Sequence, residues 1–188
     1  LSARIPSAMI REFGYQDLFF LAMAARWTIL LTLVALAGGS AVGLLVAACG
    51  SSRHLVSRML AISYVSVVQG IPLLAWLFIF YFGFPIFGIE VPAWIAAASG
   101  FSFYAGAFLG EIWRGSLLSI PRTQWEGASS IGLSYLAQLR HVIIPQAIRI
   151  ATPPTVGFIV QLIKNTSLAA VIGFVELTRE GQMTAAAT

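Results

Sequence analysis

The feature that most limits how this chain can fold is a series of long segments without a charged residue. Residues 27–50, 59–89 and 91–110 contain no Asp, Glu, Lys or Arg. A helix needs about 20 mostly apolar residues to cross roughly 30 Å of hydrocarbon. Charged residues make up 10% of the chain, whereas soluble globular proteins carry roughly 25%. The sequence therefore predicts a membrane protein built from spanning helices.

These segments, and one that follows them, predict the membrane crossings. We expect four spans, at about residues 27–50, 59–82, 91–112 and 143–163. Gly83, Pro85 and Gly88 follow the second span and are typical of a turn. A short apolar piece, residues 168–175, comes after the fourth span, and residues 183–188 are interpreted as the start of a truncated last span. The expected fold is an all-α, polytopic transmembrane helical bundle.

The arginines orient these spans by the positive-inside rule. Residues 50–58 and 114–141 carry arginines, whereas residues 82–91 carry no basic residue. We therefore expect the first two segments in the cytoplasm and the third outside. This orientation places the N-terminal tail, residues 1–26, outside despite its own arginines. The apolar side chains of the tail are spaced as in an amphipathic segment at the membrane surface: Ile10, Phe13, Leu18, Phe19 and Leu21.

Charge and composition exclude several other classes of protein. The net charge is +4, but the basic residues are scattered and form no cluster of four or more, so no nucleic-acid partner is expected. Cys49 is the only cysteine, which excludes an internal disulfide and a cysteine-based metal site. His54 and His141 have no companion residues at metal or catalytic spacing. We expect no catalytic residue, no metal site and no cofactor bound by this chain.

The loop at residues 114–142 is too long and too polar to be a simple connection. Pro121 suits the first position of a helix, Gly132 its C-terminal end, and Ser134 the N-cap of a second short helix. Pro145 is tolerated where the next span begins. Apolar and small residues recur there at roughly helical spacing: Trp125, Ala128, Gly132, Leu136 and Leu139. This stripe either meets a partner surface or packs back onto the span ends of the same subunit.

The same loop carries a recognisable pattern. Glu126-Gly127-Ala128 is followed by Gly132, six residues after the glutamate, and then by Val142-x-Ile144-Pro145. This resembles the Glu-Ala-Ala loop of permease subunits of bacterial ABC importers, whose pattern is Glu-Ala-Ala, three residues, Gly, nine residues, Ile-x-Leu-Pro. The spacing matches throughout, with small apolar changes at three positions. The resemblance implies that the loop is a coupling helix that docks on an ATPase subunit, through Gln124, Trp125, Glu126, Gly127, Ala128, Gly132, Leu133 and Pro145.

Two further motifs resemble the polar amino acid permeases of that superfamily. Gln69-Gly70-Ile71-Pro72 stands where those permeases show Arg-Gly-Thr-Pro, and Lys164-Asn165-Thr166-Ser167-Leu168 resembles their Lys-Asp-Thr-Ser-Leu. The similarity covers about residues 27–182, which are identified as the permease domain. Residues interpreted as candidates for the substrate pathway are Gln69, Gly70, Pro72, Glu111, Asn165, Thr166 and Ser167.

Four of these candidate residues, Glu111 and residues 165–167, have a structural alternative. Glu111 lies three residues before Arg114, so the two side chains can form an ion pair along a helix instead of lining a pathway. Residues 165–167 either line a pathway or subunit interface, or form a surface loop. Lys164 closes the fourth span and is expected to mark its outer end. Arg149 is expected to extend to the inner interface.

The resemblance implies a non-enzymatic transport subunit in the bacterial inner membrane, of the type I ABC importer kind. It implies three classes of protein partner: ATPase subunits that use ATP and magnesium, a second permease subunit, identical or homologous, and an external solute-binding protein. Polar amino acids or related small solutes are the expected cargo. The alternatives are a secondary transporter or channel subunit, and an integral-membrane enzyme. Mid-span coupling carboxylates with paired repeats would indicate a secondary transporter, and the sequence shows neither.

Overall fold

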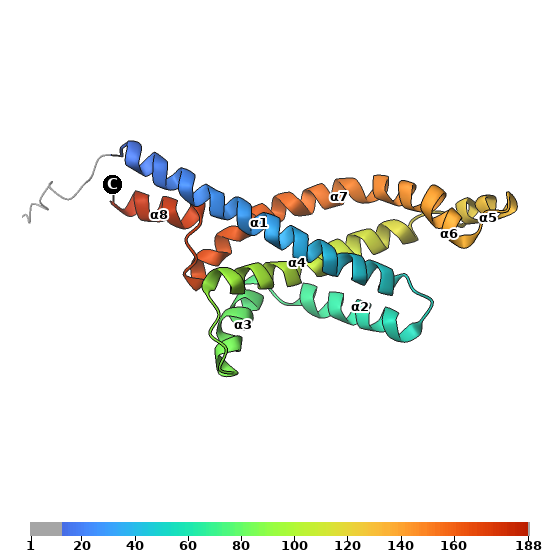
Figure 1. The fold of residues 1–188 in the computed structure, drawn as a ribbon, viewed down its shortest axis with the longest axis horizontal. Helices are drawn as coiled ribbons and strands as arrows, with labels where there is room; N and C mark the ends of the chain where they lie inside the picture. Colours follow the sequence, from blue (N-terminus) through green and yellow to red (C-terminus); the bar gives the residue numbers. More distant parts are fainter. Residues whose placement is uncertain (1–12, 188) are drawn as a thin grey trace, which may run out of the picture.

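The computed structural model describes residues 13–187, and this part of the chain folds into helices without strands. The long helices run lengthwise beside one another, and two short ones extend beyond one end (Figure 1). The helices are α1 Tyr15–Gly50, α2 Leu55–Gly70, α3 Leu73–Ile86, α4 Ala93–Leu118, α5 Arg122–Ser130, α6 Tyr135–Gln138, α7 Ile144–Asn165 and α8 Leu177–Ala187. The predicted all-α fold is confirmed for the described residues.

Helix α4 is the centre of the bundle. It packs against α1, α2, α3 and α7, and most of its residues between Ala96 and Gly110 are buried. The main apolar core gathers around Phe101, Leu109 and Leu77. Since α4 contacts all of these helices, a residue of α4 can serve as the reference for how far along the bundle a side chain of another helix lies.

Helices α1 and α4 run in the same direction and approach closely through small residues. A Cβ atom added at Gly106 would lie 2.6 Å from Val42 Cγ1, and one added at Gly110 would lie 2.6 Å from Val46 Cβ. On the α1 side, a Cβ atom at Gly39 would lie 2.5 Å from Ala105 Cβ. In lipid, helix association depends on close van der Waals packing, which small residues allow. The glycines therefore fix the register of the two helices.

The second expected span, residues 59–82, is broken in the structure. α2 ends at Gly70, α3 begins at Leu73, and the two helices are bent by 100° at the break. Ile71 has an extended backbone, with φ −111° and ψ 132°, because the ring of Pro72 disfavours a helical conformation in the residue before it. The expectation of one straight span was therefore wrong, and the Gly70-Ile71-Pro72 sequence is the local feature that explains the break.

The fourth expected span is longer than residues 143–163. Helical structure runs from Tyr135 to Ile172 without a sharp bend. It passes through a wider turn of π type at Leu139–Ile143, continues as α7, and ends in the 3₁₀ helix Thr166–Ile172. In the wider turn the Ile144 N–H donates to the Leu139 carbonyl, five residues back. The turn lies just before Pro145, which has no N–H and would crowd a regular helix.

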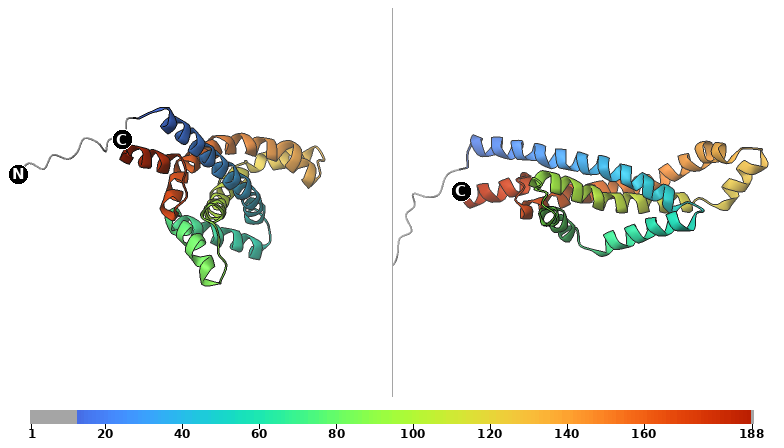
Figure 2. Two further views of the ribbon diagram at one scale, coloured as in Figure 1. Left: turned by 60° about the vertical axis from the view of Figure 1, so that its left-hand side comes forward. Right: turned by 60° about the horizontal axis from the view of Figure 1, so that its bottom comes forward.

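The two ends of the described chain lie together. α1 begins at Tyr15, within the segment expected as a tail, and the first twelve residues of that tail lie outside the described part. α8 packs beside the first part of α1, and residues 183–187, expected as the start of a further span, form its end (Figure 2). The buried Glu176 carboxylate joins the two helices by accepting hydrogen bonds from the Arg179 N–H at 3.0 Å and the Thr28 hydroxyl at 3.3 Å.

The lengths of these helices agree with a protein that crosses a membrane several times. Among the described residues, three helical segments are long and apolar enough to cross: Tyr15–Gly50, Ala93–Leu118 and Tyr135–Ile172. A fourth crossing results if α2 and α3 together form one broken span. The α1–α2 turn and α5 lie at one end of the bundle, and α8 lies at the other (Figure 1).

The close approach of α1 and α4 gives a test of the fold. Gly106→Val should destabilise the bundle by about 1–3 kcal/mol, because the added side chain overlaps Val42 and must push the helices apart. Gly115→Val is the matched control in the same helix, since a Cβ atom there would meet no atom within 4 Å. The measurement is the midpoint of thermal unfolding in detergent. Equal midpoints for the two variants would contradict this account of the interface.

Candidate functional site

The expected helix break around Gly132 is present in the structure. α5 ends at Ser130, and Gly132 follows with φ +79°. The Gly132 N–H donates to Ser129 O at 2.9 Å and the Leu133 N–H donates to Ala128 O at 3.2 Å, which is the double hydrogen-bond pattern that commonly closes a helix. The positive φ explains why a glycine stands here, because a Cβ atom is disfavoured in this conformation.

The second short helix begins as the sequence predicts. The Ser134 hydroxyl accepts a hydrogen bond from the Ala137 N–H, so Ser134 is the N-cap of α6. Pro121 precedes α5 instead of occupying its first position. α6 does not end as a separate helix but continues through the wide turn into α7. α6 is therefore part of the same continuous helical stretch as the long apolar helix α7.

Side-chain amides hold the loop together, and two of the glutamines involved, Gln138 and Gln146, are not part of any predicted motif. The buried Gln138 amide donates to Leu133 O at 2.7 Å and to Ser129 Oγ at 3.0 Å, across the break. Gln146 donates to Gln124 Oε1 at 3.1 Å, which joins the start of α7 to α5. Glutamines in a polar loop carry no sequence signal that distinguishes these bonds from contacts with water.

The predicted apolar stripe divides into a packed half and an exposed half. Trp125, Leu139 and their neighbours pack against the cluster of Ile120, Ile143 and Ala147, and Ala128 is buried. Leu136 stays 75% exposed. The packing alternative therefore holds for one half of the stripe, and contact with a partner surface stays a prediction for the exposed half.

The apolar residues that are exposed at this end of the molecule are not the same set as the predicted stripe. Ile131 is 75% exposed and Tyr135 is 62% exposed, next to Leu136. These three side chains lie at the tip of the α5–α6 pair, which extends beyond the ends of the long helices (Figure 2). We call Ile131, Tyr135 and Leu136 the tip residues. An apolar surface of this kind outside the bundle indicates contact with another protein.

A polar groove lies beside the tip. It has a volume of about 570 Å³ and is lined by Arg53, Trp125, Glu126, Ser129, Tyr135 and Gln138. The Trp125 and Tyr135 rings stack with their centroids 5.7 Å apart. Arg53 comes from the α1–α2 turn, so the groove joins both loops that the sequence places at the cytoplasmic side. Glu126 makes no ion pair with Arg122 in the structure, although the two are one helical turn apart.

The candidate pathway residues fall into three places along the bundle. Gln69, Gly70 and Pro72 surround the break between α2 and α3. This break lies at the level of Phe103 on α4, because the Tyr64 hydroxyl before it donates to Phe103 O at 2.5 Å and the Trp76 ring after it lies 4.9 Å from the Phe103 ring.

Glu111 lies apart from this level, about 12 Å further along α4 at 1.5 Å per residue. Its carboxylate accepts two hydrogen bonds from the Arg114 guanidinium, at 2.6 and 2.8 Å. The ion pair expected as the structural alternative for Glu111 is therefore present, and a place for Glu111 on the pathway stays a prediction.

Asn165, Thr166 and Ser167 mark the change from α7 to the 3₁₀ helix. Thr166 is buried and donates to Ile163 O at 2.7 Å, and Ser167 donates to Lys164 O at 2.8 Å. These hydroxyls bond to the preceding turn and thereby close α7. Thr166 is thus a structural residue of this bend, whereas Asn165 and Ser167 remain half-exposed.

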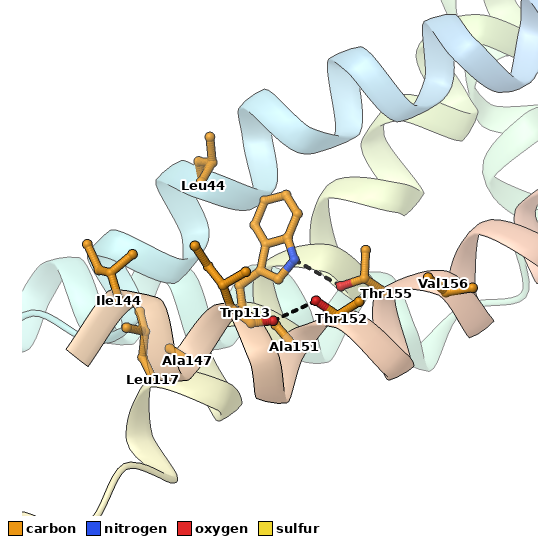
Figure 3. A pocket seen from close by; sticks show the side chains of 10 residues that line it. Leu44, Trp113, Leu117, Ile144, Ala147, Ala151, Thr152, Thr155 and Val156 are labelled. Atoms are coloured by element: carbon orange, nitrogen blue, oxygen red, sulfur yellow. Dashed lines mark hydrogen bonds between the residues drawn. The ribbon is translucent and has the colours of Figure 1, made fainter. Parts of the chain in front are cut away.

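A second cavity was not foreseen. It has a volume of about 480 Å³, lies between α1, α4 and α7, and is lined almost entirely by apolar groups (Figure 3). The Trp113 indole N–H donates to Thr155 Oγ1 at 3.2 Å within it, and Thr152 donates to Ile148 O. In the sequence, Trp113 stands beside Arg114 at a span end, and nothing there indicates contact with α7.

The comparisons with known proteins support one family. A family model described as binding-protein-dependent transport system inner membrane component matches residues 39–187. The probable amino-acid ABC transporter permease protein YckA of Bacillus subtilis is 42% identical over 157 residues, 84% of this chain and 70% of that protein. The L-cystine transport system permease protein TcyB of the same organism is 38% identical over 83% of this chain and 67% of its own length.

A solved structure agrees with these relatives. The crystal structure of an amino acid ABC transporter with histidines contains a chain with a TM-score of 0.82 and 29% sequence identity. The match covers 92% of this chain and 83% of that chain.

The turn at Gly132 gives a test of the site. Gly132→Val should destabilise the turn by about 1–2 kcal/mol, because the chain conformation there has a positive φ, although the side chain itself would find open space. Hydrogen–deuterium exchange should then be faster across residues 122–138. Gly127→Ala is the matched control in α5, where φ is not positive and added atoms also meet open space. Unchanged exchange in Gly132→Val would show that the turn is not held by its backbone geometry.

Proposed function

Because this chain belongs to the family of binding-protein-dependent transport system inner membrane components, we propose that it imports amino acids as the permease subunit of an ABC transporter. The family and the transport role expected from the sequence are confirmed by the family model and the relatives. The expected bundle of spanning helices is confirmed by the structure and by its solved neighbour. Amino acids as the cargo are supported by the names of the relatives, and polar amino acids are the narrower proposal.

The observation that carries the proposal is the α5–α6 pair. It combines the Glu126 to Pro145 pattern, the confirmed turn at Gly132, and an apolar tip that extends beyond the bundle. A turn of this kind at the end of a spanning helix suits a subunit that receives force from outside the membrane. That each of the eight predicted coupling residues contacts the ATPase subunit is likewise part of this proposal.

The partners are part of the proposal. ATP and magnesium would be used by separate ATPase subunits that bind the tip residues and the polar groove. A second permease subunit, identical or homologous, would complete the pathway, and an external solute-binding protein would deliver the amino acid. The chain itself is a transport subunit and has no catalytic role. We place it in the bacterial inner membrane as a multi-pass protein, with residues 50–58 and 114–141 in the cytoplasm.

The geometry suggests how movement would be transmitted. The Gln138 and Gln146 side chains hold α5, α6 and the start of α7 as one unit. The helix then continues without a sharp bend to Ile172. When the ATPase subunits close, displacement of the tip would tilt α7 as a whole. The pathway would thereby alternate between its outward-facing and inward-facing states.

The proposed function is tested by uptake in proteoliposomes that contain the permease with its ATPase and solute-binding protein. The cargo is offered as the twenty common L-amino acids and L-cystine, each radiolabelled. We expect uptake of at least one of them that requires ATP on the cytoplasmic side. Uptake that continues without ATP and follows an ion gradient would establish the secondary-transporter alternative instead.

The tip residues give a sharper test of the proposed contact. Ile131→Ser should weaken binding of the ATPase subunit by about tenfold or more, because an exposed isoleucine buried in an interface contributes roughly 1.5–3 kcal/mol. The matched control is Ile86→Ser, since Ile86 is similarly exposed but belongs to α3, away from the tip. The measurement is the affinity of the purified ATPase for the permease in nanodiscs. Equal affinities would remove the tip from the proposed interface.

A further inference from the structure

Helix α7 has a weak point near the middle of its length. Pro153 and Pro154 stand inside the helix, and neither has an N–H group. The carbonyls of Arg149 and Ile150, four residues earlier, therefore lose their usual hydrogen-bond donors. A proline inside a helix normally kinks it, yet the helical stretch Tyr135–Ile172 has no sharp bend. A contact outside the backbone of α7 must therefore hold this part of the helix straight.

The side chains beside the weak point do not replace the lost bonds. The Thr152 hydroxyl donates to Ile148 O at 2.7 Å, and not to the two carbonyls that lack donors. A back-bond of this kind often bends a helix. Pro153 and Pro154 are themselves exposed, so they gain no support from packing inside the bundle. The support must come from a neighbouring helix.

The neighbouring helix is α4, and the contact is made by Trp113. Its indole N–H donates at 3.2 Å to Oγ1 of Thr155, the residue directly after the two prolines. Among the residues that the structure describes, this is the only hydrogen bond between α4 and α7. The indole also meets α1, since a Cβ atom at Gly43 would lie 3.3 Å from Trp113 Cζ3. Trp113 is therefore held between two helices and can hold Thr155 in place.

The other contacts between α4 and α7 lie on either side of the weak point. Ile143 packs in one apolar cluster with Ile120 before the prolines, and Phe158 stacks on Phe108 beyond them. Apolar contacts are non-directional, so the two halves of α7 can tilt relative to each other while both stay packed. A hydrogen bond prefers a defined distance and angle. The bond to Thr155 is thus the contact that resists bending at the prolines.

We propose that Trp113 is a positioning residue for coupling, which holds α7 straight across Pro153-Pro154 through its hydrogen bond to Thr155. The inference rests on the proposed function and names what lets α7 tilt as one piece when the ATPase subunits displace the tip residues. With the bond in place, both halves of α7 move together. Without it, α7 bends at the prolines, and the movement is not carried to the half beyond them.

The straightness of α7 is measured on the permease alone in nanodiscs, by the distance between two spin labels. Cys49→Ser removes the only cysteine. The labels are attached at Arg140→Cys, in the same helical stretch before the prolines, and at Val67→Cys on α2, both of which are exposed. Trp113→Phe and Thr155→Val should each raise the bent population by about threefold or more, because one hydrogen bond is lost. The distance distribution should broaden accordingly.

The prolines supply a rescue variant, and a second tryptophan supplies the matched control. Pro153→Ala with Pro154→Ala restores two backbone N–H groups at exposed positions. Added to Trp113→Phe, this pair should return the distribution to its original width, which would not follow if the indole only filled space. Trp76→Phe loses a similar bond, from the indole N–H to Val68 O at 3.2 Å, but that bond joins α2 and α3. It should leave the distribution unchanged.

The consequence for coupling is measured in proteoliposomes that contain the ATPase and the solute-binding protein, as ATP hydrolysed per amino acid carried. Trp113→Phe should raise this ratio by about threefold or more. KM for the amino acid should stay the same, because the movement and not the binding is impaired. Thr155→Val should raise the ratio equally, and the double variant no further, since both substitutions remove the same bond. The alanine pair should restore the ratio.

Four results would overturn the inference. They are an unchanged distance distribution in both Trp113→Phe and Thr155→Val, a broadened distribution that the alanine pair does not restore, equal broadening in Trp76→Phe, and an unchanged ratio of ATP to amino acid in Trp113→Phe. Failure of the wild-type complex to carry any amino acid would instead defeat the proposed function. The distance measurements would still be readable in that case, because they need neither cargo nor ATP.

Discussion

The close contact between α1 and α4 is the constraint on which the rest of the bundle depends. In lipid there is no hydrophobic drive to bring two apolar helices together, so their association depends on how closely they fit. The glycines at positions 39, 106 and 110 allow that fit, and any larger side chain would overlap the facing helix. With α1 and α4 in fixed register, α4 can carry α2, α3 and α7 at defined levels.

Much of this fold could be predicted from the sequence because the membrane imposes simple rules. Uncharged segments such as residues 27–50 predict spans, and the glycine and serine at positions 132 and 134 predict a helix end and a helix start. The bend before Pro72 was not predicted, since the apolar character of residues 59–82 conceals a local backbone restriction. Hydropathy reports where a chain is apolar, but it does not report where a helix is interrupted.

The candidate site was predicted less completely than the fold. The pattern from Glu126 to Pro145 located the loop, and the structure shows the turn it requires. The division of the apolar stripe into packed and exposed halves could not be predicted, because helical spacing alone does not distinguish Trp125 from Leu136. Only the folded structure shows which of the two packs against the bundle.

The continuous helical stretch from Tyr135 to Ile172 joins the α5–α6 tip to the interior of the bundle, so that the two are parts of one lever. Its arm from Tyr135 to Lys164 is about 44 Å at 1.5 Å per residue. The stacked rings of Phe108 and Phe158 stand between the two ends, at a contact about which the stretch would turn if the tip were displaced. A rod that turns about such a point moves its ends in opposite directions and in proportion to their distances from it. Small displacements at position 164 would therefore accompany larger, opposite displacements at the tip.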